Sequence, residues 1–262
     1  MKISKILIVG FGSIGKKHYN YLSKYFKNIQ IGILLHKTKK NLLKRNLYYS
    51  LQDTLKFKPD AVIICSPSNH HYEHCLFFAR NKIHILVEKP IFNKIKPIKN
   101  ILYYVKKNKL VFKIGYNLRY SYLLNQLKKS INKVGQIYFV NCDVGNNIRN
   151  WRTTHYSKTV SSSKDKGGGV ILELSHEIDY LNWIFGNFNN VYSNFSKVSN
   201  LKIDVEDNAQ IIFEALNKKN LKKPFKILLT LDFLRHNNTR LILIIGEKGT
   251  LKLDLIGNTL SY

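Results

Sequence analysis

Lys89 stands where a run of apolar residues ends. Ile83 to Val87 predict a buried strand, and Glu88-Lys89-Pro90 ends it because proline has no backbone N–H to donate to a neighbouring strand. In an open sheet of parallel strands, ligands bind beyond the carboxyl ends of the strands. We therefore expect the Lys89 ammonium to face a ligand crevice, where it would hydrogen-bond a substrate hydroxyl or carbonyl oxygen and stabilise developing negative charge. The alternative is a surface lysine at a strand end.

A second group of chemically active residues lies in the C-terminal half. Glu173, His176 and Asp179 follow one another at intervals of three, so in one helix they would share a face. An imidazole between two carboxylates can act as a general base at neutral pH. The alternative is a helix histidine whose hydrogen bonds are satisfied within the fold.

A glycine-rich turn near the N-terminus predicts a dinucleotide site. Its glycines have the spacing G-x-G-x-x-G and join a buried strand at 6–9 to a helical pattern from Ile14 to about Phe26. Gly10 permits the tight turn, Gly12 leaves the pyrophosphate unobstructed, and Gly15 lets helix and strand pack closely. The N–H groups of the helix N-terminus then face the phosphates. Without a ligand the same pattern would be only a tight turn.

The segment after the second strand bears on the choice of dinucleotide. That strand is predicted at 29–35, and His36, Lys37 and further cations follow it. No carboxylate is available there to accept a hydrogen bond from a ribose 2′-hydroxyl. Because cations suit a 2′-phosphate, NADP(H) is favoured, with NAD(H) as the alternative.

The order of elements in the first half predicts an α/β domain. Apolar runs predict further strands at 60–65, 83–87 and 110–114, and helices are expected at 37–45, 71–81 and 96–108. Strands and helices that alternate in this way form a doubly wound parallel sheet, the Rossmann arrangement, with helices on both faces.

The second half has a different pattern. Strands are predicted at 137–144, 191–198, 209–215, 225–233, 240–245 and 250–255, with one long helix at 169–185. Successive strands with few helices predict an α+β domain with an open, mostly antiparallel sheet. We expect residues 1–118 to form an NAD(P)-binding domain and residues 119–262 a substrate and oligomerisation domain. The second is expected to be truncated, since the chain ends directly after a strand.

Composition and charge exclude several classes of protein. The net charge of +27 would suit a nucleic-acid binder, but the lysines are spread in ones and twos, so neither nucleic acid nor a membrane is an expected partner. With no signal-peptide pattern and no apolar run of spanning length, we expect a cytoplasmic protein. Cys65, Cys75 and Cys142 lack C-x-x-C spacing and are interpreted as reduced core thiols. No metal site is expected at the histidine cluster 70–74.

Several motifs occur in a fixed order along the chain. They are SPSNHH at 66–71, ILVEKP at 85–90, GYNLRY at 115–120, WR at 151–152 and GGG at 167–169 with ELSHEID at 173–179. Their order and spacing resemble the glucose–fructose oxidoreductase, inositol dehydrogenase and MocA (Gfo/Idh/MocA) family over nearly the whole chain. The resemblance implies an NAD(P)-dependent enzyme acting on a hydroxyl-bearing carbon of a sugar or cyclitol. The variant ELSHEID is similar to members found with surface-polysaccharide and nonulosonic-acid synthesis.

The resemblance also implies roles for individual residues. Lys89 would match the family's substrate-orienting lysine and His176 its catalytic acid/base, with Glu173 as a third catalytic candidate. The expected cofactor contacts are Gly10, Phe11, Gly12, Ser13, Ile14, Gly15, His36, Lys37, Ser66, Pro67, Asn69, His71, Glu88 and Lys89. The expected substrate contacts are Asn117, Arg119, Trp151, Arg152 and Asp179.

One departure from the family pattern keeps a second hypothesis open. The family commonly has an aspartate four residues before the histidine, where this chain has Leu172, and Glu173 is the nearest acid. The alternative function is therefore a catalytically impaired dinucleotide-binding sensor or subunit. In either case, an uncovered apolar face of the C-terminal sheet predicts a homo-oligomer.

Overall fold

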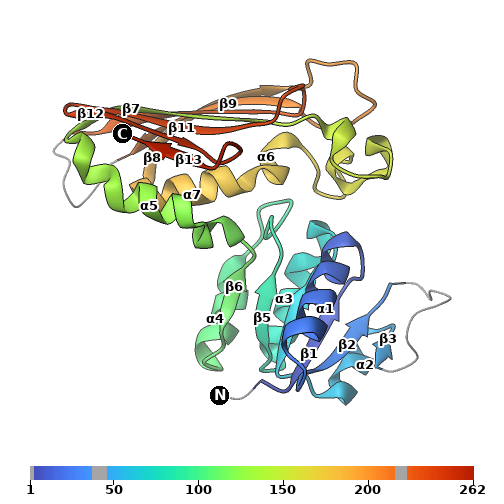
Figure 1. Cartoon of the computed structure of the whole chain (residues 1–262). Helices are drawn as coiled ribbons and strands as arrows, with labels where there is room; N and C mark the ends of the chain where they lie inside the picture. Colours follow the sequence, from blue (N-terminus) through green and yellow to red (C-terminus); the bar gives the residue numbers. More distant parts are fainter. Residues whose placement is uncertain (1–2, 37–45, 216–222) are drawn as a thin grey trace. The chain divides into compact units, whose positions relative to one another are not determined.

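The computed structural model describes residues 3–36, 46–215 and 223–262, and the fold divides into two compact units, Met1–Gly115 and Tyr116–Tyr262 (Figure 1). The helix expected at 37–45 lies outside the described residues. None of the helices within these ranges is long and apolar enough to cross a membrane.

The first unit contains a parallel sheet, as predicted, and the sheet has six strands, one more than expected. In spatial order its strands are β3 (Leu47–Tyr48), β2 (Gln30–Leu34), β1 (Lys5–Val9), β4 (Ala61–Ile64), β5 (His84–Val87) and β6 (Phe112–Ile114). The helices are α1 (Ser13–Tyr25), α2 (Leu51–Thr54), α3 (His71–Arg80) and α4 (Ile98–Lys107), with 3-10 turns at Leu55–Phe57 and Ser68–His70.

Alternate residues of the central strand β1 pack on opposite faces of this sheet. Leu7 belongs to a buried cluster with Phe78 of α3 and Ile101 of α4. Ile8 belongs to a second cluster with Leu22 of α1. Helices thus cover both faces, which is why the strands read as continuous apolar runs.

The second unit contains a seven-stranded sheet. In spatial order its strands are β13 (Thr259–Ser261), β12 (Gly249–Asp254), β11 (Thr239–Gly246), β7 (Ile137–Gly145), β10 (Phe225–Asp232), β9 (Asn208–Ala215) and β8 (Phe188–Ser196). All neighbours are antiparallel except β7 and β10. The helices are α5 (Tyr122–Ser130), α6 (Val170–Glu173) and α7 (Ser175–Phe185), with 3-10 turns at Asn117–Tyr120, Ile131–Val134, Ile148–Asn150, Tyr156–Lys158 and Val160–Ser162. The mostly antiparallel sheet is confirmed.

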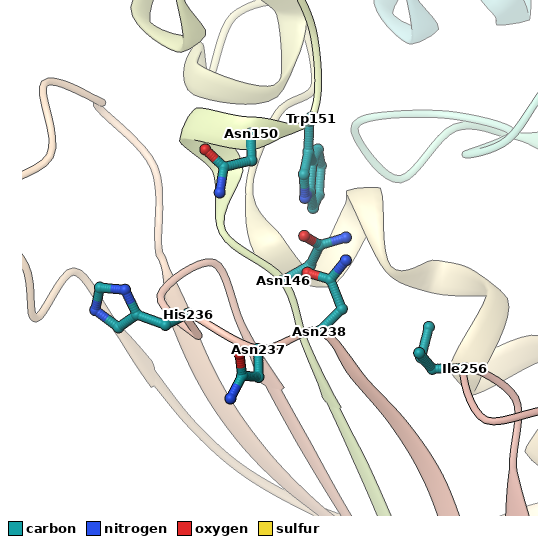
Figure 2. Close-up of a pocket in the computed structure, with 7 residues that line it drawn as sticks. All are labelled: Asn146, Asn150, Trp151, His236, Asn237, Asn238 and Ile256. Atoms are coloured by element: carbon teal, nitrogen blue, oxygen red, sulfur yellow. The ribbon is translucent and has the colours of Figure 1, made fainter.

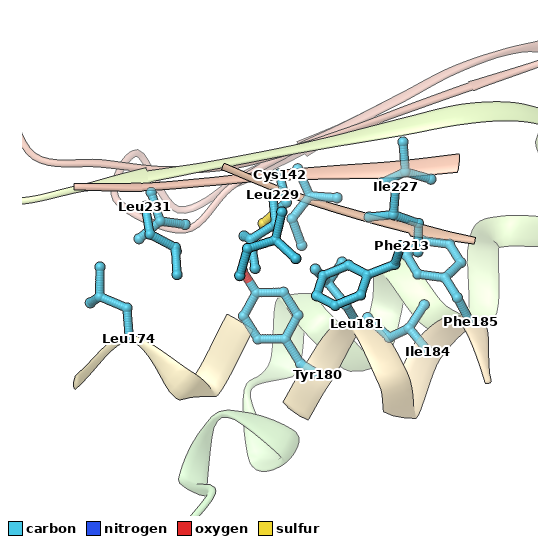
Figure 3. Packing of buried hydrophobic residues seen from close by; sticks show 14 of the residues in the cluster. Cys142, Leu174, Tyr180, Leu181, Ile184, Phe185, Phe213, Ile227, Leu229 and Leu231 are labelled. Carbon is cyan, nitrogen blue, oxygen red and sulfur yellow. The ribbon is translucent and has the colours of Figure 1, made fainter. Parts of the chain in front are cut away.

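Helices α5 and α7 lie on the same face of this sheet (Figure 1). Tyr180 and Phe185 of α7 are fully buried against strand residues such as Leu229 (Figure 3). The Tyr180 hydroxyl lies 3.2 Å from Cys142 Sγ, so the one polar atom of this ring has a partner in the core.

A buried ion pair fixes α7 against the sheet. Glu177 of α7 is completely buried, and its Oε1 lies 2.8 Å from Nε of Arg240 on β11. An unpaired carboxylate at this depth would cost several kcal/mol, so the pair sets which side of α7 faces the sheet. The adjacent His176 is only partly buried.

The prediction of one continuous helix at 169–185 is wrong. Leu174 has φ −98° and ψ +29°, outside the helical range, and separates α6 from α7. This backbone conformation places the Leu174 side chain in the core, where it is 6% exposed. Glu173 therefore ends one helix, and His176 and Asp179 belong to the next.

Candidate cofactor and active site

The three glycines after β1 have different structural roles. Gly10 has φ +87°, and a Cβ there would lie 2.9 Å from the backbone nitrogen of Ser66. A Cβ on Gly15 would collide with the carbonyl oxygen of Gly10. A Cβ on Gly12 would meet nothing within 4 Å, so this position opens onto free space. Gly10 and Gly15 are thus needed for packing, and Gly12 borders an open volume.

The start of α1 fits a bound pyrophosphate. Its N-cap, Gly12, makes no side-chain hydrogen bond, and its first turn holds no acidic residue. The positive end of the helix dipole is therefore not neutralised by a neighbouring carboxylate. Ser13 and Ile14, the first two residues of α1, are exposed beside it.

Other predicted cofactor residues near this turn have varied surroundings. Phe11 is buried, with its ring edge-on to Tyr19 at 5.6 Å between centroids. His36 is exposed just beyond β2, and Lys37 lies outside the described residues. Phe11 is thus part of the packing beneath the turn.

The turn after β4 is held by two histidines of α3. Ser66 Oγ lies 3.0 Å from His74 Nδ1, while Pro67 and Asn69 are exposed. Burial lowers the pKa of His74 to about 4, so its ring is neutral at physiological pH. Pro67 and Asn69 are left to contact a ligand.

His71 connects this turn to the turn that carries Lys89. The ring is 1% exposed, with Nε2 at 2.7 Å from the Ser66 carbonyl oxygen and Nδ1 at 3.0 Å from that of Pro90. Burial lowers the pKa of His71, and the nearby carbonyl oxygens act in the opposite direction. The ring has no surface to offer a cofactor, so we assign His71 to positioning the two turns.

Glu88 is held from α1. His18 Nε2 lies 2.7 Å from Glu88 Oε1. Gly115 packs against the other carboxylate oxygen so closely that a Cβ at this position would lie 3.0 Å from Glu88 Oε2. Sequence reasoning missed His18; the available signal was its place three residues after Gly15, about one turn along α1. The pair ties the helix of the glycine turn to the end of β5.

Lys89 is half-buried and follows β5 directly. The residue before it is held by His18, and the carbonyl group of the residue after it, Pro90, is held by His71. The Lys89–Pro90 peptide bond is cis. The contacts of His18 with the Glu88 side chain and of His71 with the Pro90 carbonyl thus hold the residues on both sides of Lys89, which favours a defined orientation of its side chain.

The grouping and ring contacts of the described cysteines and histidines in this unit bear on metal binding. Within the described ranges, no three His, Cys, Asp or Glu residues are grouped closely enough to hold a metal ion. The His70 and His74 rings are instead stacked, with 5.9 Å between centroids. Burial raises the pKa of the Cys65 thiol well above its usual range, which makes it a poor nucleophile.

In the second unit, His176 lies near the start of α7. The Tyr116 ring meets the His176 ring edge-on, with 5.6 Å between centroids. Burial raises the pKa of the Tyr116 phenol, while the neighbouring Ser175 hydroxyl acts to lower it. Sequence reasoning gave Tyr116 no role, although it stands beside the predicted Asn117. The phenol remains protonated and supports one side of the imidazole.

Arg119 and Asp179, both predicted substrate contacts, bind each other. Arg119 Nε donates to one carboxylate oxygen of Asp179 at 2.8 Å, and its terminal nitrogen donates to the other at 2.6 Å. The Asp179 side chain is 10% exposed and that of Arg119 is 43% exposed. This bidentate pair joins the turn Asn117–Tyr120 to α7, one helical turn after His176.

Glu173 has a partner from a distant loop. Ser161 Oγ donates to its Oε1 at 2.7 Å. The expectation that Glu173 shares one helix face with His176 and Asp179 is wrong, because the helix is interrupted at Leu174. Sequence spacing alone could not reveal a hydroxyl twelve residues away.

The remaining predicted substrate residues lie in loops. Asn117 is exposed in the turn Asn117–Tyr120, and Arg152 is exposed after the turn Ile148–Asn150. Trp151 packs edge-on against Phe233, with 4.9 Å between ring centroids, and lines a pocket (Figure 2). The contacts of the described residues do not join Asn117, Trp151 and Arg152 into one cluster.

Each of the two units matches a known protein family. The family described as "Oxidoreductase family, NAD-binding Rossmann fold" matches residues 4–116. The family described as "GFO/IDH/MocA C-terminal domain" matches residues 125–252. Together they cover most of both units.

Curated relatives carry related names. An uncharacterized oxidoreductase of Streptococcus pneumoniae is 25% identical over 199 residues, which are 75% of this chain and 52% of that protein. Inositol 2-dehydrogenase/D-chiro-inositol 3-dehydrogenase of Lactiplantibacillus plantarum is 25% identical over 221 residues, 80% of this chain and 59% of that protein. The chain thus spans little more than half the length of these relatives.

A solved structure shares the fold. The WlbA dehydrogenase from Bordetella pertussis, in complex with NADH and UDP-GlcNAcA, superposes with a TM-score of 0.85 and 20% identity. The superposition covers 100% of this chain and 81% of that chain. At this identity the likeness shows the fold alone.

Proposed function

Because the chain belongs to the Gfo/Idh/MocA family of oxidoreductases, we propose that it is an NAD(P)-dependent dehydrogenase or reductase that acts on a CH–OH group of a sugar derivative. The observation that carries the proposal is the set of turns after β1, β4 and β5. These strands are neighbours in the parallel sheet, so the open glycine turn, the Ser66 turn and the Lys89 turn share one edge. We assign cofactor binding to the first unit and substrate binding to the second.

The chemistry assigned to each residue follows from its type and surroundings. A bound nicotinamide would supply or accept the hydride. Lys89 holds the substrate oxygen by donating a hydrogen bond and stabilises negative charge that develops on it. His176 takes the hydroxyl proton in oxidation and returns it in reduction. Tyr116 packs edge-on against that imidazole and limits its orientation, and the Arg119–Asp179 pair lies one helical turn further along α7.

The substrate class is inferred from the relatives. The relative from Lactiplantibacillus plantarum is named for inositols, and the WlbA structure contains UDP-GlcNAcA. We infer an activated or acidic sugar, in surface-polysaccharide or nonulosonic-acid synthesis. The cations after β2 favour NADP(H) over NAD(H), since no carboxylate follows that strand to bind a ribose 2′-hydroxyl.

The test is a turnover screen with both cofactors. The purified chain is mixed with NADP+ or NAD+ and a panel of inositols, free sugars and sugar nucleotides including UDP-GlcNAcA, and nicotinamide absorbance is followed. We expect turnover on at least one sugar derivative and tighter binding of NADPH than of NADH. Tighter NADH binding would contradict the cofactor preference.

The departure at Leu172 favours a second candidate function. The nearest acid, Glu173, accepts a hydrogen bond from Ser161 and lies on the other side of the helix break from His176. A dinucleotide-binding sensor or subunit with impaired catalysis would fit this arrangement. Saturable cofactor binding with no turnover on any sugar in the screen would favour this candidate.

We also infer a homo-oligomer formed through the second sheet. On the face away from α7, Tyr192, Ile212 and Leu228 stand opposite one another on β8, β9 and β10 and are 69%, 38% and 38% exposed. A second copy of the chain would remove this apolar row from water. Ile212→Lys is expected to shift the sedimentation-derived mass toward the monomer. Leu102→Lys, an exposed change on α4, is the control and should leave the mass unchanged; equal masses for all three proteins would contradict the proposal.

A further inference from the structure

A pocket lies beyond the carboxyl ends of β7 and β10, the parallel pair in the second sheet. Asp232 of β10 is in register with Gly145 of β7, so both strands end at the same place. The pocket has a volume of about 610 Å³. Its polar lining is Asn146, Asn150 and Trp151 after β7, and His236, Asn237 and Asn238 after β10 (Figure 2).

The lining is rich in hydrogen-bonding groups. The four carboxamides each offer donors and an acceptor, and the described residues that line the pocket include no lysine, arginine, aspartate or glutamate. Arg235, next to His236, is bound to Asp143 and Asp232, so its charge is already compensated. Phosphate or carboxylate groups therefore find no lysine or arginine among the described lining residues, whereas hydroxyl and amide groups find complementary partners.

Trp151 adds an unsatisfied donor. Its indole Nε1 is buried and has no hydrogen-bond partner among the described residues. Leaving a buried donor unpaired costs about 1–3 kcal/mol, which a ligand oxygen would recover. The ring itself is held edge-on against Phe233 and so keeps a fixed orientation.

The pocket is connected to the start of α6 by consecutive residues. The Asp207 carbonyl accepts a hydrogen bond from Phe233 N at 2.9 Å, and the Glu206 carbonyl accepts one from Val170 N at 3.1 Å. The strand end behind Trp151 and the first residue of α6 are therefore held by neighbouring peptide groups. The start of α6, the helix that carries Glu173, is thus linked through residues 206 and 207 to the strand end beside the pocket.

We propose that this pocket binds a neutral sugar ring, the non-reacting part of the substrate, through its hydroxyl or acetamido groups. The proposal rests on the proposed function for its choice of a sugar. It assigns Asn146, Asn238 and Trp151 to specificity rather than to proton or hydride transfer.

The test uses Trp151 as the reporter. The chain has two tryptophans, so Trp183→Phe leaves Trp151 as the sole source of indole fluorescence. This protein is titrated without cofactor with N-acetylglucosamine and, separately, with inorganic phosphate. We expect a saturable change with the sugar and none with phosphate. Asn146→Ala and Asn238→Ala should weaken sugar binding at least about tenfold, as expected for lost buried hydrogen bonds, and Asn194→Ala, an exposed change on β8, should not.

Calorimetry on the chain with both tryptophans provides a second measurement if Trp183→Phe does not fold. The pocket assignment would be overturned by any of three results: no sugar binding, a preference for phosphate, or equal sugar affinity in all three asparagine variants. Turnover in the screen with no pocket binding would overturn this assignment alone. Sugar binding that responds to the two pocket variants, in a chain without turnover, would support the pocket while the proposed function fails.

Discussion

Lys89→Met is expected to lower kcat by about a hundred- to a thousandfold, the effect typical of removing one donor to a developing oxyanion. Methionine keeps the length and apolar stem of the side chain but cannot donate a hydrogen bond or carry charge. The dissociation constant of the cofactor should change much less, because the glycine turn and the N-terminus of α1 remain intact. Steady-state kinetics with the best substrate, together with cofactor binding by fluorescence, separate the two effects.

Two further variants sharpen this prediction. Lys113→Met removes an exposed lysine of β6 in the same unit and should leave kcat unchanged. Lys89→Arg keeps the charge but changes the geometry of the donors, so its kcat should be little higher than that of Lys89→Met. Wild-type turnover in Lys89→Met would remove this residue from the mechanism.

His176→Gln is expected to reduce kcat by about a hundred- to ten-thousandfold, the range over which a general acid–base contributes. Glutamine can still hydrogen-bond but cannot take or give a proton at neutral pH. Oxidation needs the unprotonated imidazole, so in the unsubstituted protein its rate should rise with pH as the ring loses its proton, while reduction should fall. The variant should lose this dependence in both directions.

The control for His176 is another histidine of the same unit. His155 is exposed, and its ring contacts Tyr156 and Ser157, its neighbours in sequence, so His155→Gln should keep both the rate and the pH profile. A structural role alone would lower the melting temperature of His176→Gln without changing the shape of the pH profile of its remaining activity. That result would contradict the assignment of His176 as the proton carrier.

The parts of the fold that could be predicted are those in which neighbouring residues form a recognisable pattern along the sequence. Strands buried on both faces appear as unbroken apolar runs, such as Ile6 to Val9, and the glycine turn has its own spacing. The strands β3 and β13, of two and three residues, were not predicted because such short elements carry no periodicity. Helix α5 was also missed.

The parts of the site that were missed depend on contacts between distant residues. His18 and Glu88 are 70 positions apart, and only the folded sheet brings α1 to the end of β5. The break at Leu174 is similarly invisible, because the apolar pattern runs through it while the Ser161–Glu173 bond comes from a separate loop. Spacing predicted which residue types matter, and the fold decided their partners.

The buried pair of Glu177 and Arg240 has an evolutionary consequence. A descendant that replaced only one member would leave the other charge buried without a partner. This would cost about 3–5 kcal/mol, a large share of the free energy of unfolding of an ordinary domain. The two positions should therefore covary, with acid and base lost or exchanged together. Residues that meet the substrate remain free to diversify, while the axial rotation of the helix bearing His176 is inherited unchanged.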